Sequence, residues 1–181
     1  MSEETLIRHC SPTLAGLKTG NIFSSDFENK ESLYSEIRNL NHILKAKGLR
    51  VLPLRYQNKR ALIYLYRPAK LKADFQCCEV CQILKEQGYK NANQNQCLAE
   101  LISRLRTEEA FPHEIGLFLG YPPEDVSGFI RKEPCRCTGY WKVYHNQKEA
   151  LKTFAKYRKC TEVYLEEYRN GTSLEKLAVA V

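Results

Sequence analysis

Two adjacent residues, His113 and Glu114, have the side chains of a general acid–base couple or of a pair of metal ligands. They precede the apolar run of residues 115–119, which is too short for a helix and predicts a strand buried on both faces. Neighbouring strand residues point to opposite faces, so the two side chains converge only if the strand begins after them. Two interpretations stay open: a catalytic pair, and a polar strand end in which His113 caps the strand and Glu114 pairs with an arginine.

Cys77, Cys78 and Cys81 form a group whose C-x-x-C spacing is found in redox and metal sites. A thioredoxin-like pair follows a strand and lies at the N-terminus of a helix. Here the group follows a segment of helical pattern, and Cys77 and Cys81 share an apolar face of that helix. The pattern therefore favours buried thiols.

Cys135 and Cys137 form a second group, in an expected loop beside basic residues that favour the thiolate. With Cys10 or Cys160 they could supply the ligands of a metal or cluster, for which iron, an iron–sulfur cluster and zinc are the candidates. We expect a reducing compartment, where the eight cysteines are free thiols, ligands or redox groups rather than disulfides. The sequence does not identify the cofactor.

The composition predicts one globular domain, residues 1–181. Apolar residues make up 43% and charged residues 27% of the chain. No run approaches the roughly 18 apolar residues that a membrane span needs. The N-terminal segment is acidic and polar, whereas a signal peptide is basic and then apolar. We therefore expect a cytoplasmic protein with no membrane partner.

The net charge of +7 arises from one basic block, between Glu36 and Asp74, that contains no acidic residue. Its ten basic residues are Arg38, Lys45, Lys47, Arg50, Arg55, Lys59, Arg60, Arg67, Lys70 and Lys72. Such a block attracts nucleic acid or an acidic protein, and it equally arises as a solvated face. Tyr56, Tyr64 and Tyr66 interleave with the arginines and could stack on bases or close the edge of a core. The candidate contacts to phosphate or nucleic acid are Arg50, Arg55, Lys59, Arg60 and Arg67.

Hydrophobic periodicity predicts an α+β fold: a small, mainly antiparallel sheet of about four strands with a helical majority packed on it. Two β-rich segments flank residues 57–59 and predict a hairpin, in which Asn58 takes positive φ. A further strand is expected over 140–144. Helices are expected at 2–9, stopped by Ser11-Pro12, and at 33–47, 69–87, 97–105, from 122, and 146–170.

Five segments together resemble a known family: IRHCSPTLAGLKTGNIF, LRVLPLRY, ALIYLYRP, FPHEIGLFLGYPPEDV and C-x-GYWKVY. They are similar to domain-of-unknown-function family 3793, mostly clostridial bacterial proteins with a Pro-His-Glu motif, which corresponds here to residues 112–114. The resemblance spans residues 3–177 and implies an anaerobic cytoplasm, where free thiols and oxygen-sensitive metal sites are tolerated. It implies no activity, cofactor or catalytic residue.

The first hypothesis is an accessory binding protein whose pocket is built by the ends of elements at residues 9–10, 111–123 and 135–144. It would hold a small ligand, a metal or a redox cofactor, with a small molecule or a redox protein as partner. The candidate ligand-binding residues are His9, Cys10, His113, Glu114, Tyr121, Tyr140 and Trp141.

Two further hypotheses use other features of the sequence. One is an enzyme that uses His113 and Glu114 on a small anionic substrate. The other is a nucleic-acid or acidic-protein binder that works through residues 38–72, with nucleic acid the less favoured partner. Whether the chain is an enzyme, and its oligomeric state, stay open.

Overall fold

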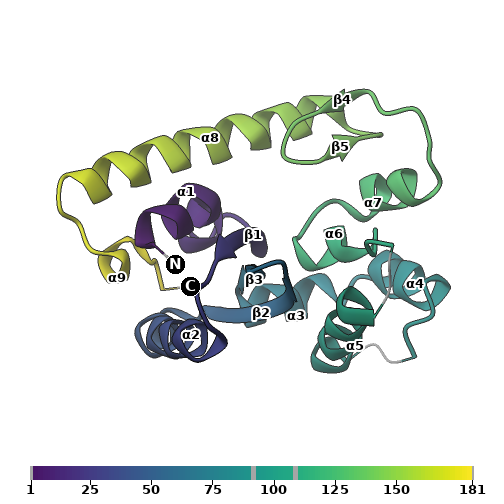
Figure 1. Cartoon of the computed structure of the whole chain (residues 1–181). Helices are drawn as coiled ribbons and strands as arrows, with labels where there is room; N and C mark the ends of the chain where they lie inside the picture. Colours follow the sequence, from purple (N-terminus) through teal and green to yellow (C-terminus); the bar gives the residue numbers. More distant parts are fainter. Residues whose placement is uncertain (1, 91–92, 108–109, 181) are drawn as a thin grey trace. The chain divides into compact units, whose positions relative to one another are not determined.

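The computed structural model describes residues 2–90, 93–107 and 110–180. Their contacts divide into two compact units: the first unit is Met1–Ala69 with Tyr157–Val181, and the second unit is Lys70–Lys156. The long helix α8 (Gln147–Arg169) contributes residues to both units (Figure 1). Each unit is described by itself.

The first unit combines helices with an antiparallel sheet of strand order β1-β3-β2. On β3, Ala61, Ile63 and Leu65 are wholly buried. They lie on one face of the strand and join apolar residues of α1, α2 and α9 in one core. The elements are α1 (Glu3–Leu14), β1 (Gly20–Asp26), α2 (Lys30–Leu44), the 3₁₀ turn η1 (Lys45–Lys47), β2 (Arg50–Gln57), β3 (Arg60–Tyr66) and α9 (Leu174–Leu177).

The predicted hairpin is confirmed as β2 and β3. It turns at Asn58 and Lys59, whose φ angles are 49° and 60°. Two successive residues with positive φ are what a two-residue turn of type I′ requires. The turn is one residue shorter than expected, because Gln57 remains in β2 and pairs with Arg60.

α1 extends beyond the predicted stop at Ser11-Pro12, so that prediction is wrong. The buried residues Ile7, Cys10 and Leu14 continue one face of the helix across the proline. The Ser11 hydroxyl donates to the Ile7 carbonyl at 2.5 Å. Packing of this face in the core therefore outweighs the backbone hydrogen bond that proline cannot make.

Arg67 follows β3 and is 2% exposed. Its guanidinium donates to four backbone carbonyls: Thr13 at 2.8 Å, Leu14 at 2.8 Å, Lys47 at 3.0 Å and Val179 at 2.7 Å. Burial lowers the pKa of the guanidinium. Arg67 is therefore an internal donor that joins separate segments of the first unit, and not the surface contact to phosphate that the basic block suggested.

The second unit is mainly helical. Its two short strands pair antiparallel, with Cys137 opposite Val143, so the strand expected over 140–144 is shorter than predicted. The single helix expected over 69–87 is divided into α3 and α4 by a break at residues 75–77. The elements are α3 (Pro68–Asp74), α4 (Cys78–Glu86), α5 (Gln94–Thr107), α6 (Ile115–Phe118), α7 (Pro123–Ile130), β4 (Cys137–Thr138) and β5 (Lys142–Val143), followed by α8.

The strand predicted over residues 115–119 is wrong, because these residues form the single helical turn α6. The Leu117 N–H donates to the Glu114 carbonyl at 3.0 Å, and Gly120, with φ 73°, reverses the chain after the turn. All four residues of α6 are buried. An apolar run that is covered on every side has no periodicity by which strand and helix can be told apart.

The α+β class with a helical majority is confirmed. Within the described residues the strands form one sheet of three and one of two, both antiparallel, instead of one sheet of about four. That the chain is a single domain stays a prediction. No helix among the described residues has the length and apolarity needed to cross a membrane.

Candidate ligand-binding site

The candidate site lies in the second unit, where α6 meets α7. Gly116 allows the close approach of these helices, since a Cβ atom there would lie 2.8 Å from Cγ2 of Val126 and 3.1 Å from Cδ2 of Tyr121. Pro123 is the first residue of α7, a position where its missing N–H has no cost. The sequence thus forms a tight corner between two short helices.

Asp125 in the first turn of α7 fixes the segment that contains β5. Its carboxylate accepts hydrogen bonds from Trp141 Nε1 at 2.7 Å, from the Tyr144 N–H at 2.7 Å and from the His145 N–H at 3.1 Å. Asp125 is 4% exposed, and a carboxylate so deeply buried needs donors of this kind. Asp125 is therefore the residue that positions Trp141 beside α7.

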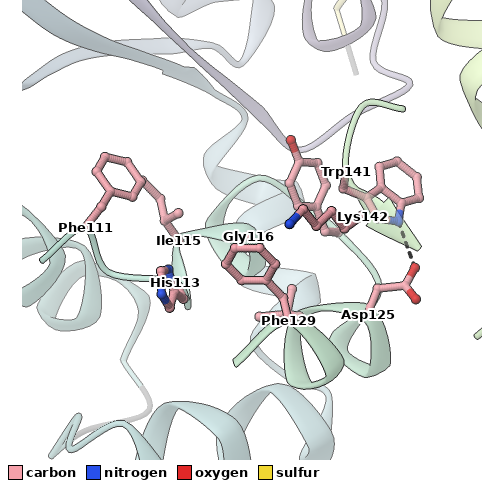
Figure 2. A pocket seen from close by; sticks show the side chains of 10 residues that line it. Phe111, His113, Ile115, Gly116, Asp125, Phe129, Trp141 and Lys142 are labelled. Carbon is pink, nitrogen blue, oxygen red and sulfur yellow. Dashed lines mark hydrogen bonds between the residues drawn. The ribbon is translucent and has the colours of Figure 1, made fainter. Parts of the chain in front are cut away.

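A pocket of about 340 Å³ lies at this corner (Figure 2). Its volume is near the lower end of the range of small-molecule sites in proteins. All of its lining residues belong to the second unit. The large apolar and aromatic side chains that form its walls are Phe111, Ile115, Tyr121, Val126, Phe129 and Trp141.

Two polar side chains of the pocket, His113 and Lys142, lie at the ring of Phe129, whereas Asp125 is bonded to Trp141 (Figure 2). The Lys142 ammonium lies 5.3 Å from the centre of this ring. The His113 imidazole meets the same ring edge-on, with 4.8 Å between ring centres. Tyr121 and Trp141 pack against each other at 5.1 Å, with 31° between the ring planes. The site thus combines flat apolar walls with a lysine, a histidine and the hydrogen-bonded carboxylate of Asp125.

Glu114, the neighbour of His113, is 2% exposed and has other partners. It accepts a hydrogen bond from the Tyr89 hydroxyl at 2.9 Å and is paired with Arg104 at 3.4 Å. The Arg104 guanidinium lies 4.2 Å from the centre of the Tyr89 ring and donates to the Gln87 carbonyl at 2.7 Å. Burial and the charge of Glu114 raise the pKa of Tyr89.

The predicted pairing of Glu114 with an arginine is confirmed, and the predicted strand cap at His113 is wrong because no strand follows it. His113 is exposed and lines the pocket, whereas Glu114, directly before α6, is bonded to Tyr89 and Arg104. The two side chains therefore serve different neighbours, and this arrangement does not favour a catalytic His–Glu couple.

Of the predicted ligand-binding residues, His113, Tyr121 and Trp141 line the pocket. Tyr140 packs on Phe154, with 5.7 Å between ring centres.

The other predicted pocket segment, residues 9–10, belongs to the first unit. His9 is stacked on Phe23 at 5.8 Å between ring centres. Cys10 is wholly buried in the core, and burial raises the pKa of its thiol.

The four candidate metal-ligating cysteines are divided between the units. Cys10 and Cys160 belong to the first unit, and Cys135 and Cys137 belong to the second. All are free thiols. Among the residues that the structure describes, no three His, Cys, Asp or Glu side chains form a group that could hold a metal ion.

The cysteines at the start of α4 are more exposed than the sequence predicted. Cys77 and Cys78 are exposed and Cys81 is half-buried, so the prediction of buried thiols is wrong for the first two. The physical reason is the break in the helix at residues 75–77, which makes Cys77 the N-cap of a new helix instead of a residue on a buried face.

The tyrosines of the basic block are not arranged as an exposed stacking platform. Tyr64 is wholly buried and Tyr66 is 8% exposed. Their rings stack on each other, with 4.6 Å between centres and 3° between planes. Tyr56 packs edge-on against Phe27 and Tyr34.

The remaining candidate phosphate contacts lie on the β2–β3 hairpin. Arg60 pairs with Asp26 at 3.3 Å, and Arg55 donates to the side chain of Gln57. Lys59 is exposed at the turn. Arg50 donates to the Leu49 carbonyl at 2.9 Å.

Comparison with known proteins gives one match. The model of the family described as protein of unknown function, DUF3793, matches residues 6–178, nearly the whole chain. The chain belongs to the DUF3793 family. No curated protein and no solved structure matches this DUF3793 chain.

Among the pocket residues of the DUF3793 chain that were not named as candidates, Phe111 and Lys142 lie within the predicted pocket segments, and Phe129 lies outside them. Phe129 lies one helical turn after Asp125 and three residues after Val126 on α7, a spacing that is also typical of a helix packed in a core. Lys142 directly follows the candidate residue Trp141 in the sequence, and this adjacency could have indicated that it lines the same pocket. Phe111 precedes Pro112 by one residue and could have been grouped with His113.

Proposed function

We propose that the second unit binds a small, flat, mostly apolar molecule that carries an anionic group. The observation that supports this most directly is the pocket of about 340 Å³ walled by aromatic side chains. Flat rings stack favourably on side chains such as Tyr121, Phe129 and Trp141. An apolar pocket with a few polar groups is the usual form of a small-molecule site.

The charges at the pocket favour an anion. Lys142 is exposed, and its ammonium contacts the Phe129 ring and forms no ion pair within the described residues. The negative charge of Asp125 is stabilised by Trp141 Nε1 and two backbone N–H groups. A carboxylate of the ligand would gain a charge-assisted hydrogen bond from Lys142.

The proposal is tested by titration with naphthalene-2-carboxylate, with 2-naphthamide as its neutral counterpart. Trp141 is the only tryptophan of the chain and lines the pocket, so its fluorescence reports directly on occupancy. We expect the carboxylate to quench the fluorescence with saturable, one-site behaviour. The amide should bind about tenfold more weakly, because it loses one charge-assisted hydrogen bond. Isothermal titration calorimetry checks the stoichiometry.

Variants separate the two parts of the proposal. Lys142→Met should remove the preference for the carboxylate, and Phe129→Ala should weaken both probes because it removes an aromatic wall. Lys148→Met, an exposed lysine of α8 that does not line the pocket, is the matched control and should bind as the wild type does. If both probes fail to bind at millimolar concentration, or if Lys142→Met and Lys148→Met behave alike, the proposal is wrong.

A further inference from the structure

Three cysteines gather at the start of α4 and do not line the pocket described above. Cys77 is the N-cap residue, Cys78 is the first helical residue, and Cys81 lies one turn further along. Cys77 and Cys78 are exposed, whereas Cys81 is half-buried. The group thus has an outer thiol and an inner thiol three residues apart, which is the arrangement of a dithiol pair.

The inner and outer thiols have different surroundings. Cys81 Sγ donates a hydrogen bond to the Phe75 carbonyl at 3.2 Å, so this thiol is held against the protein. The N-cap residue Cys77 makes no side-chain capping bond. The first N–H groups of α4 therefore lack a capping side chain, and such groups favour negative charge nearby. A thiolate is the species that attacks in disulfide exchange.

Helix geometry brings Cys78 and Cys81 within reach of each other. Cα atoms three residues apart in an α-helix are separated by about 5 Å, inside the range of about 4.4–6.8 Å observed in disulfides. Their Cβ atoms are about 5–6 Å apart in a regular helix and must approach to about 4 Å. Because Cys78 begins the helix and the N-cap is not locked by a side chain, the first turn can make this adjustment.

We propose that Cys78 and Cys81 form a dithiol that exchanges with low-molecular-weight disulfides, RSSR. The Cys78 thiolate attacks one sulfur of RSSR, the bond between the substrate sulfurs breaks, and the first RS⁻ leaves and takes up the proton that Cys78 lost. The Cys81 thiolate then attacks Cys78 Sγ, forms the Cys78–Cys81 bond and releases the second RS⁻, which takes up the proton of Cys81. The protein loses two electrons, and RSSR gains them as two thiols.

The experiment uses the reduced full-length protein, kept under argon, with glutathione disulfide as the probe. Glu79 lies between the two cysteines, so cleavage after glutamate separates them unless a disulfide joins the fragments. We expect a transient glutathione adduct on Cys78, followed by linked fragments that carry no glutathione. Because this measurement uses the wild-type protein, its outcome does not depend on whether any variant folds.

Three variants assign the roles. Cys81→Ser should keep the glutathione adduct on Cys78 and release it at least about tenfold more slowly than the wild type, because it lacks the intramolecular thiol. Cys78→Ser should give no linked fragments. Cys77→Ala removes the neighbouring exposed thiol without adding a capping side chain, and it should react as the wild type does. Linked fragments that persist in Cys78→Ser, or equal release rates in the wild type and Cys81→Ser, would overturn the proposal.

Discussion

At the scale of single residues, Glu114 and His113 contribute to different properties. The Glu114 carboxylate is almost completely buried and is bonded to Tyr89 and Arg104. Its removal leaves Arg104, which is itself largely buried, without its inner partner. His113 instead is exposed and contacts the Phe129 ring at the pocket. We therefore expect the stability of the fold to depend on Glu114, and the proposed ligand binding to depend on His113.

We expect Glu114→Ala to lower the free energy of unfolding by about 3 kcal/mol, because it breaks a buried charge pair. Glu114→Gln should lower it less, since an amide oxygen still accepts from Tyr89. His113→Ala, a change at an exposed side chain, should stay within about 0.5 kcal/mol of the wild type. Urea unfolding followed by circular dichroism measures all three. An equal loss in His113→Ala and Glu114→Ala would contradict this division.

Lys18 in the first unit is 3% exposed. Burial lowers the pKa of its ammonium from 10.5 to about 8. Below pH 8 the lysine is charged in both the folded and the unfolded chain, so its contribution is constant and unfavourable. Between about pH 8 and 10.5 the unfolded chain binds more protons than the folded one. The contribution of Lys18 to stability therefore rises with pH over this range, by an amount on the order of 3 kcal/mol.

Lys18→Met removes this titration. We expect the free energy of unfolding of Lys18→Met, relative to that of the wild type, to decrease as the pH is raised from 8 to 10.5. Lys45→Met, at an exposed position of the same unit, should show no such trend. Urea midpoints measured at several pH values test this, and a constant difference between Lys18→Met and the wild type would disprove it.

At the scale of elements, the corner between α6 and α7 depends on the absence of a side chain at Gly116. A methyl group there would lie 2.8 Å from Val126 Cγ2, closer than real contacts allow. We expect Gly116→Ala to cost about 1–3 kcal/mol of stability and to weaken binding at the pocket, because the helices must move apart.

A double-mutant cycle with Val126→Ala isolates this clash. If the valine methyl is the obstacle, Val126→Ala should cost less stability in the Gly116→Ala background than in the wild type, with a coupling energy of at least about 0.5 kcal/mol. Additive losses would show that Gly116 has another role.

Elements with a clear periodicity could be predicted from the sequence, and elements without one could not. Leu33, Ile37 and Leu44 recur at helical spacing and lie on the buried face of α2. The alternation along β3 separates its two faces but did not show which is buried, and both contain buried residues, since Tyr64 and Tyr66 are buried opposite Ile63 and Leu65. The run at 115–119 is buried on every side, so its spacing carried no information. The break before α4 was missed because residues 70–86 keep a helical spacing across it.

The candidate site could be predicted in part. Polar and aromatic residues at the ends of elements drew attention to His113, Tyr121 and Trp141, which line the pocket. Residues 9–10 could not be assigned to another unit from sequence, because nothing in the local pattern gives their distance from residue 113. Tertiary contacts alone carry that information.

At the scale of the whole molecule, α8 is a single helix whose residues up to Lys156 belong to the second unit and whose residues from Tyr157 belong to the first. Unfolding either part of a continuous helix removes hydrogen bonds from the next turn. We therefore expect the two units to unfold together at neutral pH, as a single domain does.

This expectation is tested by comparing two probes in one urea titration. Trp141 fluorescence reports on the second unit alone, whereas far-ultraviolet circular dichroism reports on the helices of both. Coincident transitions support one cooperative domain. A fluorescence transition that is complete before the circular dichroism changes would show two independently unfolding units.

The four acceptors of Arg67 are all backbone carbonyls, which gain no proton in mild acid. The links that the guanidinium makes within the first unit therefore keep their strength as the pH falls. Because every residue supplies a backbone carbonyl, substitution of a partner residue cannot remove one of these acceptors, and only a change of Arg67 itself abolishes the links.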